Sequence, residues 1–170
     1  LAVRKTHLAN TNDHAKVIAA CEEARKKTST SSFRPVYDGL AAWHALKINE
    51  VETAKPLLER MVASQTDPLG KLGTTMAKRW LTRLDREKVK LALKELYRDN
   101  IEFPKSLDAM KSLPEDKRAP FVDRWGQTWT YRLTEYKSPL FKDLRGQRYE
   151  LQSAVIGPAS DVLKAIVLPY

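Results

Sequence analysis

The sequence predicts an α+β protein: an N-terminal α-helical bundle or set of helical hairpins, followed by a helix packed on a small antiparallel β-sheet. Residues 1–84 carry apolar side chains at helical spacing, whereas the last third of the chain contains segments of strict apolar/polar alternation. The alternation gives two half-buried strand faces, formed by Trp129, Tyr131 and Leu133 on one strand and by Tyr149, Leu151 and Ser153 on the next. We therefore expect a helical domain over residues 1–84 and an α+β domain over residues 85–170.

Capping and proline signals divide the helical half into elements. Asp13 is expected to cap a helix that ends near Lys27. Pro35 suits the first turn of a second helix, which ends near Asn49, and residues 50–63 form a third. Two antiparallel helices joined by a tight turn are loosely similar to tetratricopeptide-type hairpins, although no clean internal period is present.

A long helix is expected to link the two halves. The segment 67–70 should break the chain, and from Thr74 to Phe103 there is neither Gly nor Pro. Its apolar residues fall on two faces, Met76, Ala77, Trp80 and Leu84 on the first and Val89, Ala92, Leu93 and Leu96 on the second. We expect one bridging helix, or two that meet near Asp85, with the second face packed on the sheet. An irregular connection with a short helix over residues 106–113 follows.

Three motifs occur in order in the second half. They are Phe103-Pro104-Lys105-Ser106-Leu107, then Asp123-x-Trp125-Gly126 leading to Tyr131, then Gly146-x-x-Tyr149-x-Leu151-x-Ser153. This order resembles the C-terminal globular domain of the major pseudopilins of type II secretion, a type IV pilin-like family, over roughly residues 86–161. The fold-signature motif that carries the resemblance is Asp123, Trp125, Gly126, Trp129, Tyr131, Tyr149 and Ser153.

The chain departs from the family pattern in three places. Arg124 stands where the family usually has proline. The segment that the family ties to a structural calcium ion is reduced to Ser153-Ala-Val-Ile-Gly157-Pro-Ala-Ser-Asp161, which offers a single carboxylate, whereas calcium commonly takes two or more. We therefore expect no cofactor, with calcium near Asp161 as the weaker alternative, and a final strand over residues 163–168. The long apolar N-terminal helix of pseudopilins is missing.

The resemblance implies a non-catalytic structural or adaptor protein of the bacterial cell envelope. It would be related to type II secretion or type IV pilus-like machinery and would act through contacts with protein partners. The chain starts at Leu1 without an initiator Met, so we expect a mature or truncated product whose signal or anchor has been removed, in the periplasm or at the envelope. A cytoplasmic location is the alternative. No apolar run is long enough for a transmembrane helix.

Three rival functions remain, the third being an enzyme of unrecognised type, which would require convergent titratable residues in a deep pocket. In the first, a groove between the helices at 36–49 and 50–64 binds a peptide or partner helix, with Tyr37, Trp43, Leu57 and Met61 as the candidate groove residues. The second is nucleic-acid binding, which the net charge of +9 suggests. The basic residues are spread along the chain without a binding motif, and this disfavours nucleic acid.

Catalytic and metal-binding patterns are not found in the sequence. His7 and His14 could share a helix face, but with His44 the three histidines lack metal-ligand spacing. No nucleophile elbow or phosphate-binding loop is present, so no catalytic residue is predicted. Cys21, the only cysteine, lies on an apolar helix face and is expected to be a buried, inert thiol.

Overall fold

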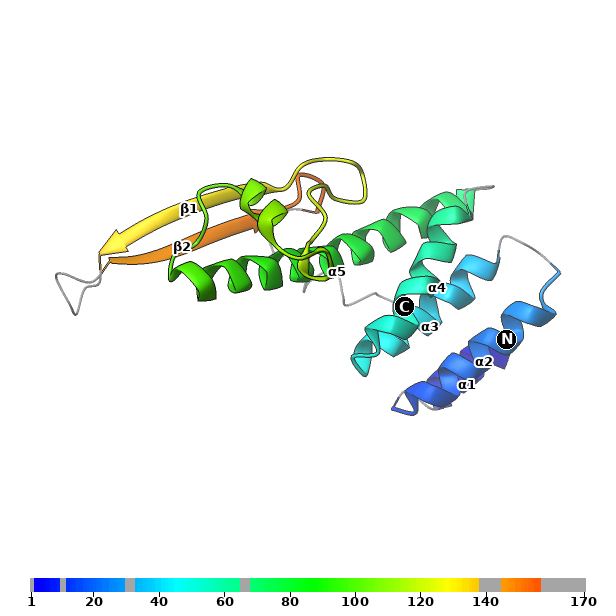
Figure 1. The fold of residues 1–170 in the computed structure, drawn as a ribbon. Coiled ribbons are helices and arrows are strands. Elements are labelled where there is room, and N and C mark those ends of the chain that lie inside the picture. The colour runs from blue at the N-terminus through cyan, green and yellow to red at the C-terminus, as the bar shows by residue number, and fades with distance from the viewer. Residues whose placement is uncertain (1, 10–11, 30–32, 65–67, 138–144, 157–170) are drawn as a thin grey trace. The chain divides into compact units, whose positions relative to one another are not determined.

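The computed structural model describes residues 2–9, 12–29, 33–64, 68–137 and 145–156. In chain order these residues form α1 (Ala2–Ala9), α2 (His14–Lys27), α3 (Arg34–Lys47), α4 (Val51–Ala63), α5 (Pro68–Asn100), two short 3-10 helices η2 (Leu107–Ser112) and η3 (Glu115–Lys117), β1 (Thr130–Lys137) and β2 (Arg145–Gln152) (Figure 1). Packed helices followed by a two-stranded antiparallel sheet confirm the predicted α+β class, with helix dominating. The predicted final strand at 163–168 and Asp161 lie outside the described residues.

The chain divides into two compact units, residues 1–81 and residues 82–170, called here the N-terminal and C-terminal units. Helix α5 contributes residues to both. Among the described helices none is both long enough and apolar enough to cross a membrane.

Local signals explain the helices of the N-terminal unit. The Asp13 side chain accepts a hydrogen bond from the Lys16 backbone N–H at 3.1 Å, which caps α2 as predicted. Pro35 lies in the first turn of α3. Between α3 and α4 the chain turns at Asn49, whose φ is 61°, and the Glu50 N–H donates to the Ala45 carbonyl at 2.9 Å. The two helices are thereby joined by a tight turn.

Helix α5 is a single helix of 33 residues, and it begins earlier than predicted. The expected chain break at 67–70 is wrong, because Pro68 occupies the first helical position, where it needs no intrahelical N–H partner. Gly73 lies inside the helix, and a Cβ atom there would come within 3.2 Å of the Pro35 Cβ atom. At the other end α5 stops at Asn100 rather than near Phe103, because Ile101 takes a positive φ of 61°.

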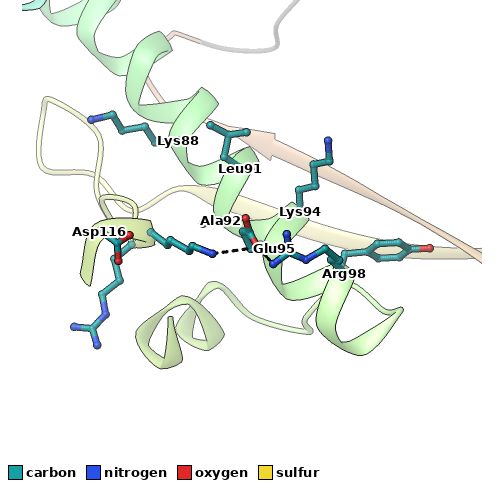
Figure 2. Close-up of a pocket in the computed structure, with 10 residues that line it drawn as sticks. Lys88, Leu91, Ala92, Lys94, Glu95, Arg98 and Asp116 are labelled. Atoms are coloured by element: carbon teal, nitrogen blue, oxygen red, sulfur yellow. Dashed lines mark ion pairs between the residues drawn. The ribbon is translucent and has the colours of Figure 1, made fainter. Parts of the chain in front are cut away.

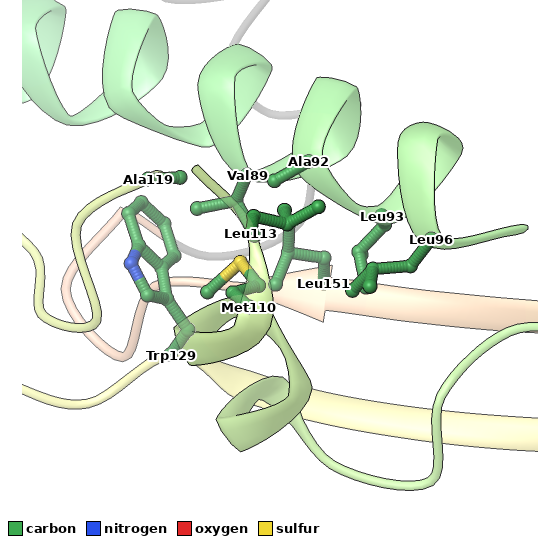
Figure 3. Close-up of a cluster of buried hydrophobic side chains, with 9 residues drawn as sticks. All are labelled: Val89, Ala92, Leu93, Leu96, Met110, Leu113, Ala119, Trp129 and Leu151. Atoms are coloured by element: carbon green, nitrogen blue, oxygen red, sulfur yellow. The ribbon is translucent and has the colours of Figure 1, made fainter. Parts of the chain in front are cut away.

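The C-terminal unit packs the second half of α5 against the hairpin and the connection that contains η2. Strands β1 and β2 pair antiparallel, with Tyr131 opposite Leu151 and Leu133 opposite Tyr149. The core is a cluster of buried apolar side chains from all these segments: Val89, Ala92, Leu93, Leu96, Met110, Leu113, Ala119, Trp129 and Leu151 (Figure 3). Its four α5 residues are the second apolar face predicted for the long helix.

Candidate functional site

The Asp123 carboxylate is the centre of the fold-signature motif, and it is buried, with 4% exposed. Its Oδ1 atom accepts hydrogen bonds from the backbone N–H groups of Trp125 at 2.9 Å and Gln127 at 3.0 Å. Its Oδ2 atom accepts one from the Ser153 hydroxyl at 2.6 Å. Gly126 has a φ of 77°, which closes the turn in a conformation that disfavours residues with a Cβ atom. The carboxylate therefore joins this turn to the residue that follows β2.

Arg124 connects the same turn to α5. Its Nε atom donates to Asp85 Oδ2 at 2.5 Å and its Nη2 atom to Asp85 Oδ1 at 3.1 Å. Its backbone N–H donates to the Thr82 hydroxyl at 3.3 Å. Such two-pronged pairing of guanidinium with carboxylate is strong and directional. Sequence reasoning missed this pair, because the partners are 39 residues apart and no local pattern relates them.

The aromatic residues of the motif are held inside the C-terminal unit. Trp129 is buried, and its Nε1–H donates to the Pro120 carbonyl at 2.9 Å. The Tyr131 hydroxyl donates to the Pro104 carbonyl at 2.7 Å. Burial, and to a lesser extent the neighbouring Tyr149, raises the pKa of Tyr131 to about 12, so its hydroxyl stays a neutral donor. The ring centroids of Tyr131 and Tyr149 are 6.0 Å apart. The aromatic side chains of the motif therefore contribute to the packing of the C-terminal unit.

The four candidate groove residues of the N-terminal unit differ in exposure. Leu57 and Met61 are buried, each with 3% exposed, whereas Tyr37 and Trp43 are half-buried. Met61 fills the space left by a glycine of α3, since a Cβ atom at Gly39 would lie 3.1 Å from the Met61 Cε atom. Leu57 and Met61 therefore belong to the packed interior of this unit, and a partner could reach only Tyr37 and Trp43 directly. The predicted groove stays a prediction.

The three histidines meet in the N-terminal unit, which the sequence did not indicate. His7 lies on α1 and His14 on α2, so the expectation that they share one helix face is wrong. The His7 Nδ1 atom is 3.0 Å from His44 Nε2, and His14 Nδ1 is 2.9 Å from His44 Nδ1. Burial, followed by His14 and His7, lowers the pKa of His44 to about 4. A neutral His44 donates through one ring nitrogen and accepts through the other.

The chain of contacts formed by His7, His44 and His14 does not have the geometry of a metal centre. His7 and His14 contact opposite nitrogens of the His44 ring, so their nitrogen atoms do not converge on one point. In the part of the chain that the structure describes, no group of three or more His, Cys, Asp or Glu side chains is arranged to hold a metal ion. Asp161, the candidate calcium ligand, lies outside that part.

A buried carboxylate and the single cysteine also lie in the N-terminal unit. Asp38 on α3 has 3% exposed and accepts hydrogen bonds from Arg25 Nε at 3.1 Å and Arg60 Nη2 at 2.8 Å. It thus ties α2 and α4 to α3. Burial, then the charges of Asp38 and Glu22, raise the pKa of Cys21 to about 12. The thiol is therefore protonated at neutral pH, as expected for an inert cysteine.

The outward side of α5 in the C-terminal unit carries a cavity of about 780 Å³, bounded on its other side by the η3 segment (Figure 2). We call it the α5 groove; its principal residues are Lys88, Leu91, Lys94, Glu95, Arg98 and Lys117. Leu91 is 63% exposed and lies among charged side chains. Glu95 forms ion pairs with Arg98 and, at 3.6 Å, with Lys117. Sequence reasoning missed this groove, although Leu91 falls outside both predicted apolar faces.

Comparison of the chain with models of protein families, with curated proteins and with solved structures finds no match.

Proposed function

We propose that the protein is a non-catalytic structural or adaptor protein of the cell envelope, related to type II secretion or type IV pilus-like machinery, and that it acts through protein–protein contacts. The C-terminal unit is its recognition module, and the α5 groove is the contact face. The helical N-terminal unit supplies a second surface for interaction.

One observation carries the contact-face assignment: α5 is amphipathic in the C-terminal unit, but an apolar residue remains on its outward face. Val89 and Leu93 point into the core, and each has 0% of its surface exposed. At 100° per residue, Leu91 lies roughly 150° around the helix from the centre of that core face. Leu91, with 63% exposed, offers an apolar contact within a hollow whose lining is otherwise mostly charged, and this supports the assignment of the hollow as a contact face.

The envelope setting is supported by the motif resemblance and by what the motif residues do. In this chain Asp123 and Ser153 join the Trp-Gly turn to the end of the hairpin, and the second half of α5 packs on the same hairpin. A helix packed on an antiparallel sheet through such a turn is the arrangement that the pilin-like resemblance implies. His44 and Asp38, by contrast, are buried and make their contacts inside the N-terminal unit.

Fractionation of cells that make the natural full-length gene product tests the setting. We expect the protein in the periplasmic or membrane-associated fraction, and we expect the same result when a small epitope is added at either end. Recovery in the cytosolic fraction together with a known cytosolic marker would contradict the proposed setting.

A further inference from the structure

The α5 groove has an excess of positive charge. Its cations are Lys88, Lys94, Arg98, Lys117 and Arg118, and its carboxylates are Glu95 and Asp116, so the lining carries five positive and two negative charges, a net +3. One of the two carboxylates, Glu95, is already paired with Arg98 and Lys117. Lys88 and Lys94 have no carboxylate partner among the residues that the structure describes. Two exposed cations thus flank the groove without a carboxylate partner in the described part of the chain.

The centre of the groove is apolar. Leu91 lies between Lys88 and Lys94 in sequence, and the two lysine side chains extend from α5 on either side of it (Figure 2). Ala92 adds a small residue at the base, and the methylene stems of the lysines extend the apolar surface while their ammonium groups stay in water. An occupant that fits must therefore combine carboxylates at its edges with at least one apolar side chain between them.

These features favour a polypeptide over a nucleic acid. A single-stranded nucleic acid would require exposed aromatic rings on which bases stack. The one aromatic residue of the groove, Tyr97, is 39% exposed, and its ring packs against Phe103 with centroids 4.6 Å apart. A phosphate backbone would also meet the Asp116 and Glu95 carboxylates, whereas a peptide can place an apolar residue over Leu91 and direct its acids to the lysines.

We infer that the α5 groove binds an acidic, amphipathic segment of a partner protein, with its carboxylates on Lys88 and Lys94 and an apolar side chain on Leu91. This inference rests on the proposed function and names the chemistry of its partner. From Lys88 to Arg98 the helix rises about 15 Å, which matches a partner helix of about three turns. The ion pairs at the rim set the orientation and the rate of association, and Leu91 supplies the desolvated contact.

The test uses the whole 170-residue chain and a synthetic helical peptide of about twelve residues. The peptide has glutamates along one face and leucine at its centre, and a scrambled peptide of the same composition is the comparison. We expect fluorescence anisotropy to show binding of the ordered peptide that weakens with added salt, and roughly tenfold weaker binding after Lys88→Glu with Lys94→Glu. Leu91→Ser should weaken binding without changing the salt dependence.

The matched control reverses two exposed charges outside the groove, Lys105→Glu with Lys137→Glu, and should leave binding unchanged. Because all of the altered side chains are exposed, circular dichroism should show the same helix content in every variant. Equal affinity for the ordered and scrambled peptides, or equal loss in the groove and control variants, would overturn the inference. Tighter binding of a single-stranded oligonucleotide through the same lysines would overturn it in favour of nucleic acid. None of these results affects the fractionation test of the cell-envelope setting.

Discussion

The Asp123 side chain accepts the hydrogen bonds that organise the Trp-Gly turn. Its two oxygens accept hydrogen bonds from two backbone N–H groups of the turn and from the Ser153 hydroxyl, and the carboxylate itself is buried, with 4% exposed. A buried donor that loses its acceptor costs its full desolvation free energy, which exceeds the net gain of forming the bond. The turn should therefore be sensitive to this residue out of proportion to its size.

We predict that Asp123→Ala lowers the free energy of unfolding by about 2–4 kcal/mol, because three donors are left without an acceptor. Ser153→Ala, which removes one of the three, should cost about 1 kcal/mol. Urea unfolding followed by tryptophan fluorescence measures both. Asp116→Ala, at an exposed carboxylate, is the control and should change the free energy by less than about 0.5 kcal/mol. A loss at Asp123 no larger than that at Asp116 would refute the central role of this carboxylate.

His44 makes the N-terminal unit sensitive to acid. Its pKa of about 4 in the folded chain lies below the value of about 6.5 that histidine has when unfolded. Between these two values the unfolded chain binds more protons, so the contribution of His44 to stability is complete above pH 6.5 and is lost as the pH falls towards 4. The full difference between these two pKa values corresponds to about 3 kcal/mol.

We expect the free energy of unfolding to fall between pH 6.5 and pH 4, and to fall less steeply in His44→Gln, which keeps a polar side chain but cannot titrate. Chemical denaturation at a series of pH values gives both curves. Carboxylates titrate at the lower end of this range in either protein, so the difference between the two curves reports His44 together with its contacts to His7 and His14. Parallel curves over the whole range would show that His44 is not the titrating group.

Among the elements, α5 contributes residues to the core, to the α5 groove and to the anchoring of the Trp-Gly turn in the C-terminal unit. One side packs on the hairpin, the opposite side forms the α5 groove, and its residues Thr82 and Asp85 hold the Trp-Gly turn through Arg124. In the resembling family the position of Arg124 is usually proline, which has neither a charge nor an N–H group. This chain therefore attaches the turn to its helix by an ion pair of its own.

We predict that Arg124→Pro destabilises the protein by about 3 kcal/mol, because Asp85, with 4% exposed, would keep a buried charge without a partner. Asp85→Leu combined with Arg124→Pro should recover part of that loss, since the combined change removes both charges. Thermal or urea unfolding of the two single variants and the double variant completes the cycle. Strictly additive losses would mean that the two side chains do not stabilise one another.

The sequence predicts the elements well where a local rule governs them. Helical phase identifies Val89, Ala92, Leu93 and Leu96 as core, and strand alternation identifies Trp129 and Leu151. The start of α5 is mispredicted because Gly73 normally weakens a helix, whereas here the absent side chain lets Pro35 pack closely. Helix propensity describes an isolated segment, so it does not include a packing contact, such as that of Pro35 with Gly73, that forms only in the tertiary fold.

At the scale of the whole molecule, the contacts that sequence reasoning missed are those between distant residues. Nothing in the sequence indicates that Arg124 pairs with Asp85, or that His7 contacts His44. Taken alone, each of these residues has the pattern of an ordinary surface charge or of an isolated histidine. The α5 groove was missed for a related reason: Leu91 becomes notable only once the opposite side of α5 is known to be the packed one. Within the fold-signature motif, by contrast, the segment from Asp123 to Tyr131 is continuous in sequence, so local turn and strand rules apply to it.

The central claim is that the outward face of α5 is covered by a protein partner at the cell envelope. Its most direct test is photo-cross-linking in cells from a benzophenone amino acid placed at Leu91, with Val36, an exposed residue of α3, as the matched control position. We predict a discrete cross-linked protein in the envelope fraction from position 91, and its loss when Lys88→Glu and Lys94→Glu are also present. Absence of any adduct from position 91, or the same adducts from both positions, would contradict the claim.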